Sequence, residues 1–258
     1  MTDSFQEKLA GELAGIESAD LRRTVREVAS AQGARVRLEG REVLNFSSND
    51  YLGLANHPAL KESAVQAIEN FGTGAGAARL ISGSQSPHHE LENVLANFKG
   101  TESALAFSSG YAAALGTIPA LVGTGDVVVL DKLVHASLVD AAKLSGAKLR
   151  VSKHNDLADL ARILEWAAEQ GGRTLVVAES VYSMDGDLAP LLNLVELKEQ
   201  HGAWLMLDEA HATGLYGEGR RGVAEEFDVA ARVEVQMGTL GKAKNISLNI
   251  ENFNNFKE

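Results

Sequence analysis

Residues 203–211 read Ala203-Trp-Leu-Met-Leu-Asp-Glu-Ala-His211, an apolar run that ends abruptly in charged and polar residues. A continuous apolar run of this length is typical of a strand buried on both faces of a parallel sheet. The carboxylate of Asp208 emerges at the end of this run, where a buried charge needs a partner. The stretch therefore predicts a parallel sheet with Asp208 at the carboxyl end of one strand.

The same pattern repeats along the chain. Short apolar runs alternate with segments whose apolar residues recur at helical spacing. Strands are expected at residues 103–107, 127–130, 148–151, 175–178, 204–207 and 233–236, and helices at 58–71, 87–98, 137–144, 156–169 and 190–200 and, rich in alanine, after Gly110. This alternation predicts an α/β fold with a mainly parallel sheet covered by helices on both faces.

The two ends of the chain differ from this alternation. Residues 3–32 read as one or two amphipathic helices, with Leu9, Leu13, Ile16 and Leu21 on one face, and short strands follow at 34–38 and 42–46. We expect three parts: an N-terminal helical and strand segment (1–45), a large domain (46–243) and an atypical tail (244–258).

The tail is rich in asparagine, at positions 245, 249, 252, 254 and 255, and contains no Gly, Ala or Val. One interpretation is a polar C-terminal tail. The other is foreign sequence that replaces the natural continuation of the large domain.

Composition excludes several classes of function. A net charge of -11 disfavours nucleic acid, whose binding usually needs a basic face. The absence of cysteine excludes disulfides and thiolate metal sites, and His88-His89 lacks the spacing of a zinc site, so no metal is expected. The N-terminus has no apolar signal region and no run of eighteen apolar residues occurs, which predicts a cytoplasmic protein without a membrane partner.

Candidate site residues follow the strands, because ligands of open parallel sheets bind beyond the carboxyl ends of the strands. Gly110 and Tyr111 open a helix, whose free amides could bind a phosphate, although an ordinary glycine turn fits equally well. His135 could stack on a flat ligand, or could be a surface residue or a helix cap. Ser183 could donate a hydrogen bond, or could belong to a simple turn.

The strongest pairing is that of Asp208-Glu-Ala-His211 with Gly238-Thr-Leu-Gly-Lys242. The Asp208 carboxylate could pair with a protonated pyridine nitrogen, His211 could reach the adjacent ring oxygen, and the Thr239 hydroxyl could contact a phosphate. Lys242 could hold an aldehyde, provided that burial or nearby cations lower its pKa from about 10.4; alone it would read as a solvated lysine. These are the groups that pyridoxal 5'-phosphate (PLP) needs.

A second interpretation of Asp208-Glu-Ala-His211 is the signature of a helicase class. Those enzymes need a phosphate loop of the form G-x-x-x-x-G-K-[ST], and the chain has none. Together with the acidic net charge, this excludes a helicase.

The motifs taken together resemble the α-oxoamine synthases, PLP-dependent enzymes of the aspartate-aminotransferase fold (fold type I). The resemblance extends from the N-terminus to Ala243. It is carried by Asn45-Phe-Ser-Ser-Asn-Asp-Tyr-Leu-Gly-Leu54, Gly72-Thr-Gly-Ala-Gly-Ala-Ala-Arg-Leu-Ile-Ser-Gly83, Asp131-Lys-Leu-Val-His-Ala-Ser-Leu138, Ser180-Val-Tyr-Ser-Met-Asp-Gly-Asp187, Asp208-Glu-Ala-His-Ala-Thr-Gly214 and Gly238-Thr-Leu-Gly-Lys-Ala243.

The resemblance implies a role for each candidate residue. Lys242 would hold the cofactor and act as the catalytic base, and Asp208 would bind the pyridine nitrogen. The remaining cofactor contacts would come from His135, which would stack on the ring, from His211 and Ser183 at the phenolic oxygen, and from Gly110, Tyr111 and Thr239 at the phosphate. Arg22 matches an arginine that contacts the acyl substrate.

The implied reaction condenses an amino acid with an acyl thioester and releases CO2. The sequence is most similar to the biotin-pathway members, which use L-alanine and a pimeloyl thioester, and His135 would polarise the thioester carbonyl. Glycine C-acetyltransferase, 5-aminolevulinate synthase and serine palmitoyltransferase are close alternatives, and an ordinary aminotransferase of the same fold is a more distant one. The resemblance also implies a homodimer.

The chain departs from this family after Lys242. Family members continue with a further strand of the sheet and a C-terminal small domain, which we expect to be missing here. An unpaired apolar sheet edge would follow from the missing strand, and no residue can be assigned to the arginine that binds the amino-acid carboxylate. A catalytically inactive fragment is therefore the second functional hypothesis.

Overall fold

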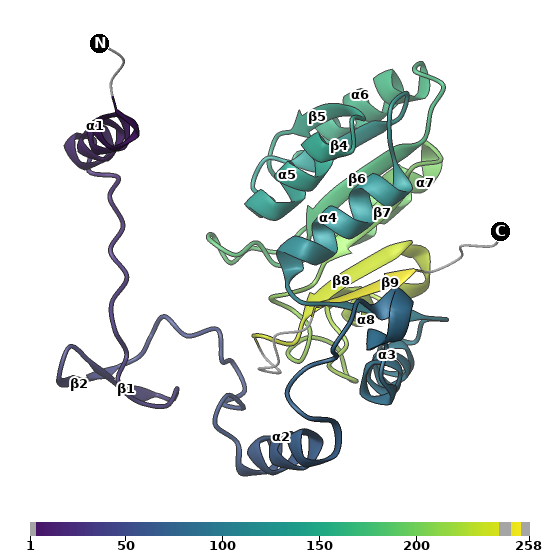
Figure 1. Cartoon of the computed structure of the whole chain (residues 1–258). Coiled ribbons are helices and arrows are strands. Elements are labelled where there is room, and N and C mark those ends of the chain that lie inside the picture. The colour runs from purple at the N-terminus through teal and green to yellow at the C-terminus, as the bar shows by residue number, and fades with distance from the viewer. Residues whose placement is uncertain (1–3, 243–248, 254–258) are drawn as a thin grey trace. The chain divides into compact units, whose positions relative to one another are not determined.

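The chain divides into two compact units, Met1–Ser47 and Ser48–Glu258, which are described separately. The structure is a computed structural model, and it describes residues 4–242 and 249–253 (Figure 1). Within this described part, no helix has the length and apolar character needed to cross a bilayer.

The N-terminal unit contains one helix and a two-stranded sheet. Helix α1 (Phe5–Ser18) begins with a capping box in which the Ser4 hydroxyl accepts from the Glu7 amide. Strands β1 (Arg35–Leu38) and β2 (Arg41–Leu44) pair antiparallel. The prediction of one or two helices up to residue 32 is wrong beyond Ser18: residues 21–32 form no helix, and Asp20, with a left-handed φ of 53°, follows the end of α1.

The second unit is built on a seven-stranded sheet of order β3-β9-β8-β7-β6-β4-β5. All pairs of neighbouring strands are parallel except those that β9 makes. The strands are β3 (Ala104–Phe107), β4 (Val127–Asp131), β5 (Lys148–Ser152), β6 (Thr174–Glu179), β7 (Trp204–Asp208), β8 (Val235–Thr239) and β9 (Asn249–Phe253). The prediction of a mainly parallel α/β sheet is confirmed.

Strand β9 corrects one expectation. It lies between β8 and β3 and pairs antiparallel with both, so the gap expected in the sheet is filled. Ladder hydrogen bonds are made by the backbone, and therefore even an Asn-rich segment can supply them. The rest of the predicted tail, residues 244–248 and 254–258, lies outside the described residues, as does Ala243 of the lysine motif.

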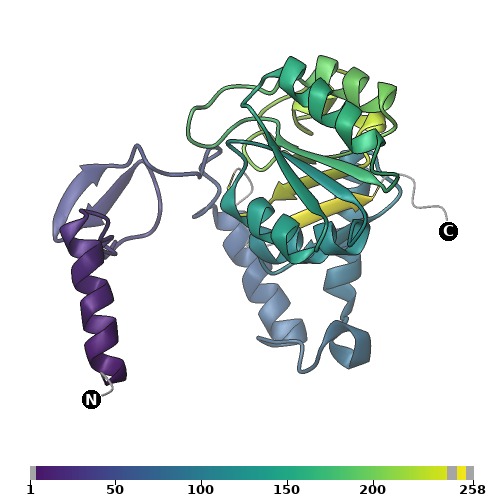
Figure 2. The same cartoon turned by 90° about the horizontal axis from the view of Figure 1, so that it is seen from above.

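Helices cover both faces of this sheet (Figures 1 and 2). Alternate residues of β4 point to opposite faces: Val127 and Val129 join one buried core, and Val128 and Leu130 join the other. Helices α4 (Gly110–Leu121) and α5 (Ala136–Leu144) pack on one core, and α6 (Leu157–Ala168) and α7 (Leu191–Gln200) pack on the other. The remaining helices are α2 (Pro58–Phe71), α3 (Ser86–Lys99), α8 (Val223–Glu226) and the short η1 (Arg79–Gly83) and η2 (Ala230–Arg232).

Candidate active site

The carboxyl ends of the central strands bring polar side chains to one edge of the sheet. Glu179 at the end of β6 pairs in register with Asp208 at the end of β7, and Asp208 pairs with Met237 of β8. Helix α4 begins after β3 and α5 begins after β4, so their N-termini reach the same edge. This is where ligands of open α/β sheets bind.

A pocket of about 210 Å³, partly open to solvent, lies at this edge. Its lining includes seven of the predicted site residues: Gly110, Tyr111, His135, Asp208, His211, Thr239 and Lys242. The other lining residues are Ser137, Glu179, Ala210 and Met237. Strand β8 extends to Thr239, so this hydroxyl belongs to the strand itself and not to the loop that was expected to carry it.

Two predicted site residues lie outside this lining. Ser183 is exposed in the loop between β6 and α7. Arg22 belongs to the N-terminal unit, where its guanidinium forms an ion pair with Glu17.

Lys242 is the first of three polar side chains that are hydrogen-bonded in series. Its Nζ is 2.6 Å from Nε2 of His211, and Nδ1 of His211 is 2.7 Å from the Tyr51 hydroxyl. Burial lowers the pKa of Lys242, although the nearby carboxylates of Asp208 and Glu179 oppose this effect. Burial also lowers the pKa of His211 to about 4, and the neighbouring Lys242 and His135 add to the shift. His211 is therefore neutral and can accept a hydrogen bond from the lysine.

Asp208 is a buried carboxylate that faces the pocket. One of its oxygens accepts from the Ala210 amide at 2.8 Å. Burial raises the pKa of Asp208, while that amide and the charges of Lys242 and His135 lower it. A carboxylate in this state favours a cationic partner in the pocket.

His135 combines two of the roles that the sequence left open. It is the N-cap of α5, where its Nδ1 accepts from the Ser137 amide at 3.2 Å, and it also lines the pocket. Its own backbone amide donates to Oε1 of Glu179 at 2.5 Å. These contacts hold the His135 ring beside the pocket, at the carboxyl ends of the strands.

The start of α4 presents free donors to the pocket. The Ser109 hydroxyl accepts from the Ala112 amide at 3.1 Å, while within the described residues the amides of Gly110 and Tyr111 donate to no protein acceptor. Free amides and the helix dipole favour an anion at such a terminus. The Thr239 hydroxyl, which accepts from the Gly241 amide, borders the same pocket.

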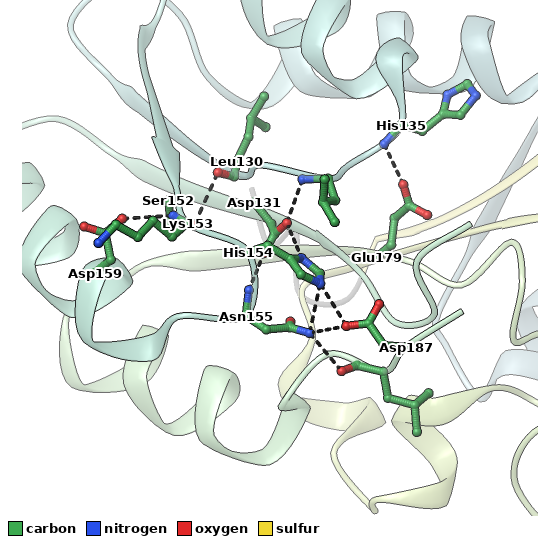
Figure 3. Close-up of polar contacts among 12 residues, drawn as sticks. Leu130, Asp131, His135, Ser152, Lys153, His154, Asn155, Asp159, Glu179 and Asp187 are labelled. Atoms are coloured by element: carbon green, nitrogen blue, oxygen red, sulfur yellow. Dashed lines mark hydrogen bonds and ion pairs between the residues drawn. The ribbon is translucent and has the colours of Figure 1, made fainter. Parts of the chain in front are cut away.

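A second polar cluster lies beside the pocket, at the ends of β4 and β5 (Figure 3). Nδ1 of His154 is 2.9 Å from Asp131, and Nε2 is 2.8 Å from Asp187. The Asn155 side chain donates to the same Asp187 oxygen at 2.8 Å. Burial lowers the pKa of His154, but the hydrogen bonds to the two carboxylates outweigh burial and raise it above its ordinary value.

Sequence reasoning missed two residues of the site, Glu179 and Tyr51. Glu179 follows the apolar run Leu175–Ala178 just as Asp208 follows its own run, so the same signal could have found it. Tyr51 precedes His211 by 160 positions, and nothing in the sequence shows that the two meet.

Comparisons with known proteins agree with this geometry. The model of the family "Aminotransferase class I and II" matches residues 41–247. An 8-amino-7-oxononanoate synthase from Geobacter sulfurreducens is 57% identical over 236 residues, which are 91% of this chain and 60% of that protein. The chain thus spans about three fifths of the length of this relative.

Solved structures superpose on most of the chain. A serine palmitoyltransferase from Sphingomonas wittichii aligns with a TM-score of 0.90 and 34% identity, over 99% of this chain and 65% of that one. A structure described as SPT with a PLP internal aldimine aligns with a TM-score of 0.91 and 31% identity, again over 99% and 65%. These superpositions place the sheet and its helices in a known fold.

Proposed function

The chain belongs to the aminotransferase class I and II family, and from this premise we propose that it binds PLP and condenses L-alanine with a pimeloyl thioester. Its fold is that of the large domain of fold type I PLP-dependent transferases, and its resemblance to the α-oxoamine synthases is confirmed by its relatives. The proposed products are 8-amino-7-oxononanoate, CO2 and the free thiol, as in biotin synthesis. The observation that carries this proposal is the convergence of Lys242 and the buried Asp208 on one pocket.

The residues of the pocket fit PLP. The buried carboxylate of Asp208 suits a protonated ring nitrogen, and the free amides of Gly110 and Tyr111 suit a phosphate. Thr239 would add a hydroxyl at the phosphate, and His211 and Ser183 would bond the ring oxygen. We assign the whole cofactor site to the predicted large domain, residues 46–243.

When bound, PLP supplies a protonated ring that stabilises negative charge at the α-carbon of the amino acid. Asp208 keeps the ring nitrogen protonated. Burial lowers the pKa of Lys242, so a larger fraction of its amine is neutral at a given pH and able to take the α-proton. His135, which lines the pocket, would stack on the ring and would donate a hydrogen bond to the thioester carbonyl.

The substrates follow from the similarity to the biotin-pathway relative. Arg22 is proposed to contact the acyl chain, on the basis of its motif Asp20-Leu-Arg-Arg23. The cytoplasm supplies amino acids and acyl thioesters, and we propose that compartment for the protein.

A homodimer is supported by large apolar side chains that the second unit exposes. Leu80, Ile81 and Met184 are 98%, 82% and 92% exposed. A contact with a second copy of the chain would remove this apolar surface from water, which is favourable. Sedimentation equilibrium of the chain with and without PLP tests this assembly, and a monomer at all concentrations would contradict it.

The first experiment is a visible absorption spectrum of the purified chain with PLP, beside a Lys242→Ala variant. We expect an absorption band that requires Lys242, followed by formation of 8-amino-7-oxononanoate from L-alanine and pimeloyl-CoA. A band without product would reduce the function of this chain to cofactor binding, as the inactive-fragment hypothesis states. Transfer of the amino group to a keto acid would favour an aminotransferase instead.

A further inference from the structure

We propose that Glu179 is a positioning residue, which holds the loops that carry His135 and Ser183 through their backbone amides. These loops follow β4 and β6, and the pocket lies beside them. The consequence for the cofactor rests on the proposed function, whereas the contacts themselves belong to the chain alone.

The contacts of Glu179 join two separate loops. Its Oε1 accepts from the His135 amide at 2.5 Å (Figure 3), and the Ser183 amide also donates to its carboxylate. The residue is only 2% exposed. Glu179 thus contacts both loops and also lines the pocket.

The fold alone does not account for a carboxylate at this place. Burial and the neighbouring charge of Asp208 raise the pKa of Glu179 to about 7, which means that its ionised form is unfavourable here. The two amides and the charge of Lys242 oppose this shift. A carboxylate can accept at both of its oxygens, whereas a glutamine replaces one of them by an NH2 group that cannot accept from an amide. The geometry therefore favours a carboxylate over its neutral isostere.

Glu179 also acts on the charges around it. The groups that interact with its carboxylate are Asp208, Lys242 and the buried Tyr182. Burial lowers the pKa of Lys242, while the negative charges of Asp208 and Glu179 raise it. Replacing Glu179 by a neutral residue therefore shifts the titration of Lys242 to lower pH. This shift follows from the loss of the charge itself, whereas amide exchange in the two loops follows the positioning role.

The first test is hydrogen–deuterium exchange on the cofactor-free chain, for the wild type, Glu179→Gln and Glu179→Ala. We expect Glu179→Ala to speed exchange by 10-fold or more in both loops, residues 132–137 and 181–188, with strand 127–130 unchanged. Glu179→Gln keeps one acceptor oxygen and should therefore speed exchange in the two loops less than Glu179→Ala does. Wild-type exchange in both loops of both folded variants would overturn the proposal.

Glu234→Ala is the matched control. Glu234 also accepts a backbone amide, that of Leu205 at 2.7 Å, but this amide lies at the opposite end of the sheet. Its loss should destabilise the chain without changing exchange in the two loops. If Glu179→Ala fails to fold, Glu179→Gln against this control decides the result.

The second test measures PLP affinity from pH 6 to 9. Glu179→Ala should weaken binding by 10-fold or more, and Glu179→Gln should move the midpoint of the pH profile to lower pH. An unshifted profile with unchanged affinity in both variants would overturn the positioning role. If the wild type itself shows no band that requires Lys242, the proposed function fails, and the exchange experiment still decides the role of Glu179.

Discussion

Two partly buried polar clusters lie at the same edge of the sheet, and they are built in opposite ways. The pocket cluster consists of Glu179, Asp208, His211 and Lys242. Its carboxylates have raised pKa values, its lysine has a lowered one, and its members surround an open volume. The second is the His154 network of Asp131, His154, Asn155 and Asp187, in which both ring nitrogens have carboxylate partners.

The opposite directions of the pKa shifts distinguish polar groups that stabilise the fold from polar groups that are suited to bind a ligand. In the His154 network, hydrogen bonds overcome the cost of burial and favour the charged imidazole. In the pocket cluster, burial dominates and the charged forms are disfavoured. A cluster whose charges are not compensated internally is suited to a charged ligand. Substitutions in the two clusters should therefore affect different observables.

Lys242→Ala should have the largest effect. It removes the amine that is proposed to hold PLP, so the visible band and any product formation should be lost completely. The thermal midpoint of the cofactor-free chain should stay the same or rise, because a partly buried amine is lost. A retained band in the variant would contradict the assignment of this lysine.

Asp208→Asn should separate binding from stability. A hydrogen bond to a charged group contributes roughly 1.5–3 kcal/mol, so PLP affinity should fall about 10- to 100-fold. The pKa of Asp208 is raised in the folded state, so the ionised form costs stability at neutral pH. The cofactor-free variant should therefore be as stable as the wild type or more so in urea unfolding. A large loss of stability would place Asp208 with the His154 network instead.

His154→Gln should show the reverse pattern. It leaves the partly buried Asp131 without its cationic partner, which should cost about 1–3 kcal/mol of unfolding free energy. PLP affinity should change much less than in Asp208→Asn, since no atom of His154 lines the pocket. Urea unfolding and a PLP titration on the same sample check both parts.

The pH dependence of stability should show the smallest effect. The folded-state pKa of His154 is raised, so its contribution is complete below the unfolded value near 6.5 and is lost as pH rises through the folded value. The stability gap between wild type and His154→Gln should therefore narrow from pH 6 to pH 9. Glu179 titrates in the same pH range, but it is present in the wild type and in His154→Gln alike, so its effect cancels in the difference between them. A constant gap would show that the pKa of His154 is the same in the folded and the unfolded chain.

Much of this protein could be predicted from its sequence. Apolar runs such as 203–207 predicted the parallel strands, and the residues that follow them predicted most of the pocket lining, including Asp208, His211 and Lys242. This succeeds because the carboxyl ends of parallel strands meet at one edge, so that residues distant in sequence converge whatever the exact packing. Helix α2 was predicted from a local pattern, because Pro58 is typical of the first turn of a helix.

Only the tertiary structure decided the rest. The contact of Tyr51 with His211, the bonds of Glu179 to two loops and the pairing of β9 between β8 and β3 have no local signal. The pKa of a carboxylate depends on its burial and on neighbouring charges from other strands, which no spacing in the chain reveals. The sequence determined which groups come to the edge of the sheet, and the three-dimensional packing determined how deeply each is buried and which charges surround it, and hence the direction in which its pKa is shifted.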